Sequence, residues 1–224
     1  KNMQHLKQHE ILEMTVLENL SKGGFLRSLV FGGGTMLRLC HELPRYSVDL
    51  DFWFSRKEKT TTFERELLRF LEERYRMTDS KNKHYTLLYE FKSPLSERKL
   101  KIEIRKEISR SGTEEKIAYS PFSTLQVAVR TFSLDESAKR KLLAIRGRNE
   151  MRDYFDLEFL LRRGASLNLS EEDRRFILRR ISRFKPSDYG SILGSLLEKK
   201  LRDHYAKNGF VYLSEKINAS RGMI

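Results

Sequence analysis

The sequence contains a single cysteine, Cys40, and only five histidines. One cysteine cannot form a disulfide within the chain, and it cannot supply the ligands of a cysteine-built zinc site. This scarcity excludes a disulfide-stapled domain and a cysteine zinc site, and it predicts a cytosolic protein whose stability comes from its hydrophobic core.

Long apolar segments are also missing. No apolar run approaches the roughly twenty residues that a membrane span needs, and the segment from Lys1 to Glu10 is too polar for the apolar part of a signal peptide. We therefore expect a soluble, cytoplasmic protein with no membrane partner.

The chain lacks the two common glycine-rich signatures of nucleotide binding. The turn at Gly32-Gly33-Gly34-Thr35 is not followed by the Gly-Lys-Thr of a P-loop, and the G-x-G-x-x-G dinucleotide fingerprint is absent. Any phosphate chemistry at this turn must belong to another class of protein.

Positive charge is what the chain has in excess. Its 224 residues include 44 Lys and Arg against 31 Asp and Glu, which gives a formal net charge of +13 and a pI near 9.8. This balance is typical of a protein that binds a polyanion, and equally of a basic solvated surface. Arg175, Arg179 and Arg183 recur at four-residue steps, so they would line one helix face, where they could contact RNA phosphates.

Hydrophobic periodicity divides the chain near residue 133. Before that point it predicts helices at 4–20, 35–43 and 60–77, and strands at 25–31, 46–54, 84–92, 100–108 and 124–132. After it, the pattern predicts only helices, at 133–146, 152–162, 170–183 and 188–207. We therefore expect an α+β fold, with a mixed sheet flanked by helices in residues 1–132 and a helical domain in residues 133–224.

The turn from Gly32 to Thr35 lies between a predicted strand and a predicted helix. Glycines there allow backbone N–H groups to approach a phosphate closely, and a helix N-terminus is electropositive. The same turn could also serve only to save space, so the pattern leaves both interpretations open.

Asp49 and Asp51 lie two residues apart on a predicted strand and therefore project from the same face. Adjacent carboxylates repel unless a cation lies between them, so the pair predicts a divalent metal, with Mg²⁺ favoured by oxygen-only ligands. The alternative is that both residues simply lie in solvent at a strand end.

Glu103 lies between Ile102 and Ile104 on another predicted strand. Beside the aspartate pair it would supply the third carboxylate of a two-metal phosphoryl or nucleotidyl transfer site. Taken alone, such a glutamate is more often an ion-pair partner, here for Lys101 or Arg105.

Two motifs carry a resemblance to a known family. Gly33-Gly34-Thr35 followed by Arg45-Tyr46-Ser47-Val48-Asp49-Leu50-Asp51-Phe52 resembles the opening of the AbiEii/AbiGii toxin family, which includes the MenA-like toxins, within the nucleotidyltransferase superfamily. Glu136, Lys141 and the run from Arg152 to Leu157 are similar to a second element of that family. The two motifs occur in the family's order, which makes the resemblance specific.

The resemblance implies a role for each matching residue. Gly33, Gly34 and Thr35 would hold the triphosphate of an incoming nucleotide, and Lys141 would steady it. Asp153 would orient Lys141 or the nucleotide. Asp49 and Asp51 would bind Mg²⁺, and Glu103 would complete the metal site by analogy with the superfamily. For Lys141 the alternative is a solvated lysine. For Asp153 and Asp156 it is ordinary ion pairing within the helix, since Arg152 and Asp156 are four residues apart.

The resemblance also implies a fold and a reaction. We expect a minimal nucleotidyltransferase sheet, followed by a helical domain that completes the nucleotide and substrate site. The reaction would be Mg²⁺-dependent transfer of a nucleoside monophosphate from an NTP to a hydroxyl, with an RNA 3′ end, of tRNA in particular, as the acceptor. The protein would act as the toxin of a toxin–antitoxin or phage-defence pair, with a cognate antitoxin as a further partner.

Two alternatives remain open from the sequence. The same fold could modify a protein or a small molecule, by nucleotidylation or by kinase-like phosphorylation. The chain could also be a non-catalytic module that binds RNA or a partner. The retention of three acidic residues, Asp49, Asp51 and Glu103, argues against a decayed site.

Overall fold

The computed structural model describes residues 2–219. The chain divides into two compact units, Lys1–Ser133 and Leu134–Ile224. The first unit contains the sheet, and the second contains helices and helical turns.

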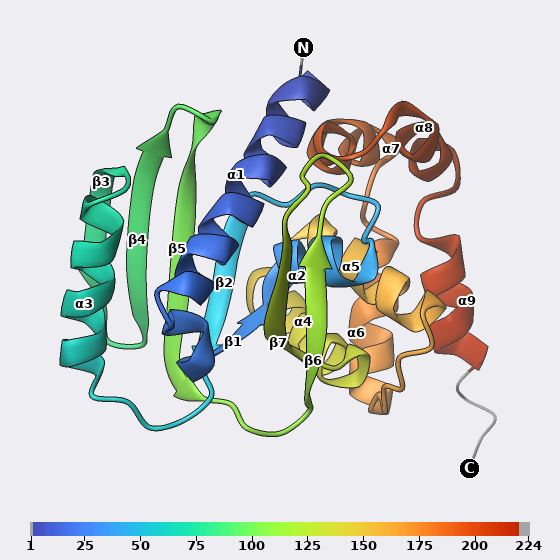
Figure 1. Cartoon of the computed structure of the whole chain (residues 1–224). Helices are drawn as coiled ribbons and strands as arrows, with labels where there is room; N and C mark the ends of the chain where they lie inside the picture. Colours follow the sequence, from blue (N-terminus) through green and yellow to red (C-terminus); the bar gives the residue numbers. More distant parts are fainter. Residues whose placement is uncertain (1, 220–224) are drawn as a thin grey trace. The chain divides into compact units, whose positions relative to one another are not determined.

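The first unit is built on a seven-stranded mixed sheet of order β3-β4-β5-β2-β1-β7-β6 (Figure 1). Two neighbouring pairs, β1 with β7 and β2 with β5, are parallel, and the other pairs are antiparallel. The strands are β1 (Leu29–Gly32), β2 (Asp49–Phe54), β3 (Arg76–Asn82), β4 (Thr86–Ser93), β5 (Ser96–Ile108), β6 (Thr113–Tyr119) and β7 (Gln126–Phe132).

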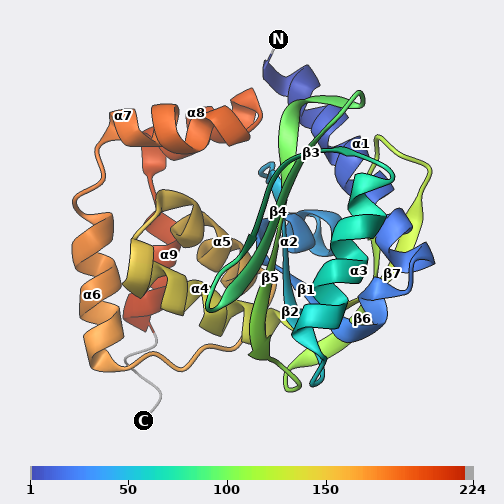
Figure 2. The same cartoon turned by 90° about the vertical axis from the view of Figure 1, so that its left-hand side faces the viewer.

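Helices α1 (Asn2–Lys22) and α3 (Thr60–Glu72) lie on the same side of this sheet (Figures 1 and 2). Every second strand residue faces them, and these residues form the core: Leu50 and Phe52 of β2 and Ile102 and Ile104 of β5 are fully buried. In β2 over residues 49–52 and in β5 over residues 100–104, the side chains therefore alternate between an apolar face under the helices and a polar face on the other side.

The predicted α+β fold is confirmed, but several boundaries differ. The sequence pattern missed β3 and β6, which are the two edge strands and carry mostly exposed or half-exposed side chains. An edge strand pairs on one side only and does not need the apolar alternation that identifies a central strand. The helix predicted at 60–77 ends earlier, at Glu72, because Arg76 and Met77 already belong to β3.

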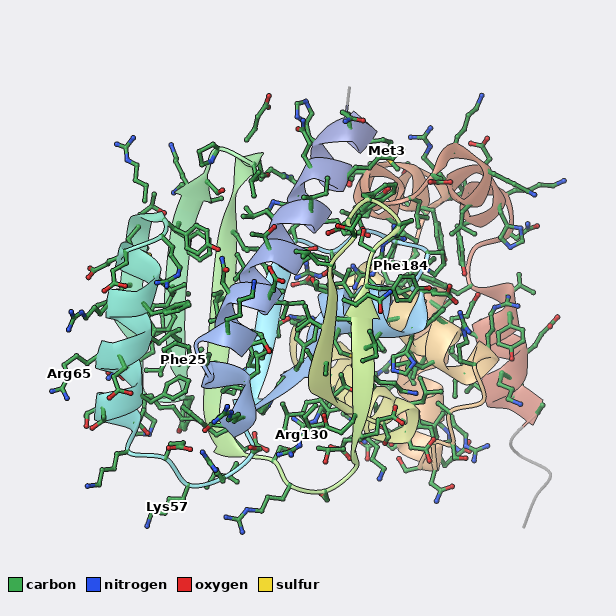
Figure 3. All side chains as sticks on the ribbon, in the orientation of Figure 1. Met3, Phe25, Lys57, Arg65, Arg130 and Phe184 are labelled. Carbon is green, nitrogen blue, oxygen red and sulfur yellow. The ribbon has the colours of Figure 1, made fainter. Side chains whose placement is uncertain are left out.

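The first unit also contains α2 (Gly33–His41), which follows β1 directly, and a short 3₁₀ turn at Phe25–Ser28. The strand predicted at 25–31 is therefore shorter than expected and begins at Leu29. Phe25 packs edge-on against Phe63 and Phe70 of α3, which explains the apolar character of this segment (Figure 3).

The second unit is helical. Its elements are α4 (Leu134–Arg148), α5 (Met151–Arg162), α6 (Glu171–Ile181), α7 (Pro186–Asp188), a π-helical turn (Tyr189–Leu193), a 3₁₀ turn (Gly194–Leu196), α8 (Lys199–Asn208) and α9 (Val211–Ala219). The single helix predicted at 188–207 is wrong, because these two turns interrupt it. Tyr189 turns inward there and packs against Phe184 and Phe210 in the core of the unit.

Among residues 2–219, none of the helices combines the length and the apolarity that a membrane crossing requires.

Candidate active site

Asp49 and Asp51 lie on the face of β2 that points away from α1 and α3. Leu50, between them, is fully buried and pairs with Ile102 of β5, which in turn pairs with Tyr89 of β4. The Tyr89 hydroxyl lies 3.4 Å from the backbone carbonyl of Glu64 in α3, so this row faces the helices. The two aspartates therefore project from the opposite face.

The parallel pairing of β2 with β5 brings Glu103 to the same place. Asp51 is directly opposite Glu103, and Asp49 is directly opposite Lys101. Directly opposed side chains on neighbouring strands lie on one face and within contact range. We call this side of β2 and β5, with Asp49, Asp51 and Glu103, the carboxylate face.

A lysine lies between two of these carboxylates. The Lys101 Nζ atom is 3.3 Å from Asp49 Oδ2 and 3.1 Å from Glu103 Oε1. Partial burial would lower the pKa of Lys101, but the negative charges of Asp49 and Glu103 outweigh that effect and raise it above its usual value. Glu103 therefore does form the ion pair with Lys101 that the sequence offered as an alternative. Glu103 nevertheless remains directly opposite Asp51 on the neighbouring strand.

The glycine turn brings the start of α2 against the carboxylate face. Gly33 has φ +76°, and a Cβ atom added there would clash with the Asp51 carboxylate. A Cβ atom at Gly34 would lie 2.5 Å from Arg45 Nη2 and 2.7 Å from Ser47 Oγ. A side chain at either position would clash with these neighbouring atoms, so both positions require glycine. At Gly33 the positive φ also favours glycine.

The Thr35 side chain faces inward, toward the start of β2. Its side chain is fully buried, and its hydroxyl donates to the backbone carbonyl of Asp49 at 2.6 Å. This bond links the first turn of α2 to the start of β2, so the Thr35 hydroxyl holds the strand that carries the aspartates.

The sequence pattern did not indicate two buried polar residues of α1, His9 and Glu13, that lie close to this hydrogen bond. Glu13 Oε1 lies 3.4 Å from the Thr35 hydroxyl, and His9 Nε2 lies 2.9 Å from the carbonyl oxygen of Val48. Burial, followed by the nearby charge of Glu10, raises the pKa of Glu13 well above its usual value. The only signal in the sequence was polar residues on a helix with a strongly apolar face, which does not reveal their partners.

In the second unit, three residues of the second motif, Lys141, Asp153 and Asp156, meet in one buried cluster between α4 and α5, whereas Glu136 pairs with Arg140. Lys141 Nζ lies 3.1 Å from Asp153 Oδ1 and 2.6 Å from Asp156 Oδ2. Both aspartates are fully buried, and Lys141 is nearly so. The interpretation of Lys141 as a solvated lysine is therefore wrong.

Arg148 completes this cluster, and no pattern in the sequence indicated it. Its guanidinium donates to both carboxylate oxygens of Asp153, at 2.8 Å each. Burial alone would raise the pKa of Asp153, but the hydrogen bonds and positive charges of Arg148 and Lys141 outweigh burial and hold it below its usual value. We call Lys141, Arg148, Asp153 and Asp156 the α4–α5 cluster.

The carboxylate face fits a divalent cation in its chemistry. Asp49, Asp51 and Glu103 offer only oxygen donors, and a cationic group, the Lys101 ammonium, already bridges two of them. Within the part of the chain that the structure describes, no three acidic, histidine or cysteine side chains converge tightly enough to form a ready-made metal cage. A metal would have to take oxygens that now contact Lys101.

Comparison with solved structures supports the fold. The chain aligns with a candidate nucleotidyltransferase from Helicobacter pylori at 17% identity and a TM-score of 0.51, covering 97% of each chain. It also aligns with JHP933 from Helicobacter pylori (18% identity, 97% and 95% coverage, TM-score 0.49) and with the nucleotidyltransferase toxin MenT4 from Mycobacterium tuberculosis (16% identity, 96% and 90% coverage, TM-score 0.48). A search of curated protein sequences found no significant match.

Comparison with protein families shows which family the chain belongs to. Residues 15–208 match the family described as nucleotidyl transferase AbiEii toxin of type IV toxin–antitoxin systems. The match includes both motifs on which the resemblance was based. Family membership implies an NTP substrate and a cognate antitoxin. The chain belongs to the AbiEii family of nucleotidyltransferase toxins.

Proposed function

We propose that this toxin transfers a nucleoside monophosphate from an NTP to an RNA 3′ end, with tRNA as the acceptor. In this reaction the RNA hydroxyl oxygen forms a bond to the α-phosphorus while the bond to the pyrophosphate oxygen breaks. The hydroxyl proton leaves, and pyrophosphate is released. The observation that carries the proposal is the register of β2 and β5, which places Asp51 opposite Glu103 and next to Asp49 on one face.

The carboxylate face would hold the metal, for which we propose Mg²⁺ in a two-ion site. When bound, two such ions stabilise the attacking and the leaving oxygens of the displacement. The chain's own contribution is to keep the three carboxylates on one face. Gly33 allows Asp51 to lie against the start of α2, and the Thr35 hydroxyl fixes the strand at Asp49.

The first turn of α2 would bind the triphosphate. Its first backbone N–H groups have no partners within the helix, and a helix N-terminus favours an anionic ligand. Because the Thr35 hydroxyl donates to Asp49, Thr35 would contribute to the triphosphate site through its backbone and through the position of β2.

In the second unit, we propose that Lys141 contacts the triphosphate and that Asp153 orients it. Two buried carboxylates hold the Lys141 ammonium within about 3 Å, so its charge is fixed in place before substrate binds. Asp156 and Arg148 are positioning residues in this proposal, because each acts through Lys141 or Asp153.

The charge of the chain supports a nucleic acid as the acceptor. The net charge of +13 favours a polyanion over a protein or a small molecule. We place the activity in the cytoplasm, where NTPs and tRNA occur together, in growth control or in phage defence.

Incubation with each labelled NTP, Mg²⁺ and total RNA tests this proposal. We expect label in a tRNA-sized band that depends on one NTP and on the divalent ion. Label in protein or in a small molecule instead would support the alternative acceptors, and no label in any fraction would contradict the proposed reaction.

Arginines on α6 and in the turn after it give a prediction about RNA binding. Arg175, Arg179 and Arg183 are exposed, and Arg175 has only an exposed ion pair with Glu171. We expect RNA affinity to fall as salt rises. Replacing all three arginines with glutamate should weaken binding and reduce the slope of log K against log salt by roughly 0.7 for each single-strand phosphate that is no longer neutralised. Fluorescence titrations at several salt concentrations measure both quantities.

The matched control uses basic residues of the first unit. Lys57, Arg65 and Arg69 are also exposed, and Lys57 and Arg65 point outward at the edge of the sheet unit (Figure 3). Replacing these three with glutamate changes the net charge equally. If both triple variants lose affinity to the same extent, total charge rather than the α6 segment determines binding.

A further inference from the structure

We infer that Lys101 is a built-in counter-ion of the carboxylate face, which holds the carboxylates together in the metal-free protein and competes with the metal for them. This inference rests on the proposed function, because it concerns the same metal site. It assigns a role to a residue that neither motif contains.

The first support is position. Lys101 precedes Glu103 by two residues on β5, so the two side chains share a face, and it lies directly opposite Asp49 on β2. Its ammonium lies between the carboxylates of two different strands, at 3.3 Å and 3.1 Å. A divalent ion shared by the same two residues would have to use the same space.

The second support is burial. The side chains of Lys101, Asp49 and Glu103 are 33%, 28% and 24% exposed, so each charge is partly removed from water. Carboxylates in this situation repel each other more strongly than they would in solvent, and a cation between them is correspondingly more stabilising.

The third support comes from what the carboxylate face lacks. Within residues 2–219 no ready-made cage of three ligands is present, although three carboxylates lie on one face. Instead, the contacts of Lys101 hold Asp49 and Glu103 around an ammonium group. Metal binding must therefore break both ion pairs and move a positive charge away from the incoming cation.

Removing the Lys101 charge should strengthen metal binding. For Lys101→Met we expect Mn²⁺, titrated alone by calorimetry, to bind about tenfold or more tightly than it binds the wild type, since the competing cation is gone. The metal-free variant should melt at a lower temperature than the wild type, because Asp49 and Glu103 lose their shared partner. Mn²⁺ should raise its melting temperature more than that of the wild type.

Three variants make the test specific. Lys101→Arg keeps the charge and should bind Mn²⁺ with nearly wild-type affinity, and Lys101→Gln provides a second neutral side chain if the methionine variant folds poorly. Lys99→Met is the control for total charge, because Lys99 lies two residues earlier on β5 and pairs with Glu90 at 2.7 Å instead. Its Mn²⁺ affinity should not change.

The outcomes separate the inference from the proposed function. If the wild type binds Mn²⁺ and Lys101→Met binds it equally or more weakly, the counter-ion role is wrong while the metal site stands. Equal strengthening in Lys99→Met would reduce the effect to net charge and would also overturn the inference. If neither the wild type nor any variant binds Mn²⁺, the metal site and the inference both fail.

Discussion

Replacing Asp49 or Asp51 with asparagine is expected to lower nucleotidyl transfer by about a thousandfold or more while the protein stays folded. Each change removes a charge and a metal ligand but keeps the size of the side chain. On the carboxylate face it also relieves repulsion between neighbouring carboxylates, which offsets the weakened ion pair with Lys101 at Asp49. The free energy of unfolding should therefore change by no more than about 1 kcal/mol.

Activity assays and thermal melts of the same preparations check this expectation. Glu90→Gln is the matched control, because Glu90 lies on the same sheet face, opposite Lys101 on β4, and pairs with Lys99. It should keep full activity. A variant of Asp49 or Asp51 that remains active, or one that loses activity only because its melting temperature collapses, would argue against the metal assignment.

Replacing Lys141 with alanine is expected to have the largest effect on stability. It removes the 2.6 Å partner of Asp156 and leaves Asp153 to its pair with Arg148, and both carboxylates are fully buried. Breaking a buried ion pair by removing one partner costs about 3–5 kcal/mol. Chemical denaturation of the wild type and Lys141→Ala measures this difference.

A compensated variant separates the structural role of Lys141 from its proposed catalytic role. Lys141→Met combined with Asp156→Asn removes one charge of each sign and leaves the pair between Arg148 and Asp153 intact. We expect this double variant to recover most of the lost stability. Its turnover should remain low, and turnover should fall more than NTP affinity, because Lys141 acts on charge that develops in the transition state. If activity returns together with stability, the α4–α5 cluster is only a scaffold.

The activities of Lys141 and Asp153 variants, measured singly and together, test whether these two residues act as a unit. If the two residues act as a unit, Lys141→Ala, Asp153→Ala and the double variant should lower activity per folded molecule by similar factors. If the two losses multiply, the residues act independently and the assignment of Asp153 as the orienting residue is wrong.

The sequence was sufficient for the elements that have regular apolar patterns. The alternation around Asp49 and Asp51 identified β2, and the alternation around Glu103 identified β5. Neither pattern could show that these strands pair in parallel with Asp51 opposite Glu103, because register is a property of two segments that are distant in the sequence. The edge strands β3 and β6 were missed because their side chains are mostly exposed.

The sequence was less informative about hydrogen-bond partners. It placed Thr35 at the glycine turn but could not show that the Thr35 hydroxyl donates to the Asp49 carbonyl. It offered a helix pair between Arg152 and Asp156, whereas Asp156 pairs with Lys141 and Arg152 with Glu150. Such partners depend on how α4 packs on α5 and α2 on β2, and local spacing does not determine this.

NTP labelled at different phosphorus atoms tests most directly whether the reaction at the carboxylate face transfers a nucleoside monophosphate. The protein is incubated with RNA and Mg²⁺ and with NTP labelled at either the α- or the γ-phosphorus. We predict that the RNA acquires the α-label and not the γ-label, and that Asp51→Asn abolishes this transfer. Transfer of the γ-label, or transfer of the α-label that survives in Asp51→Asn, would contradict the proposed reaction at this site.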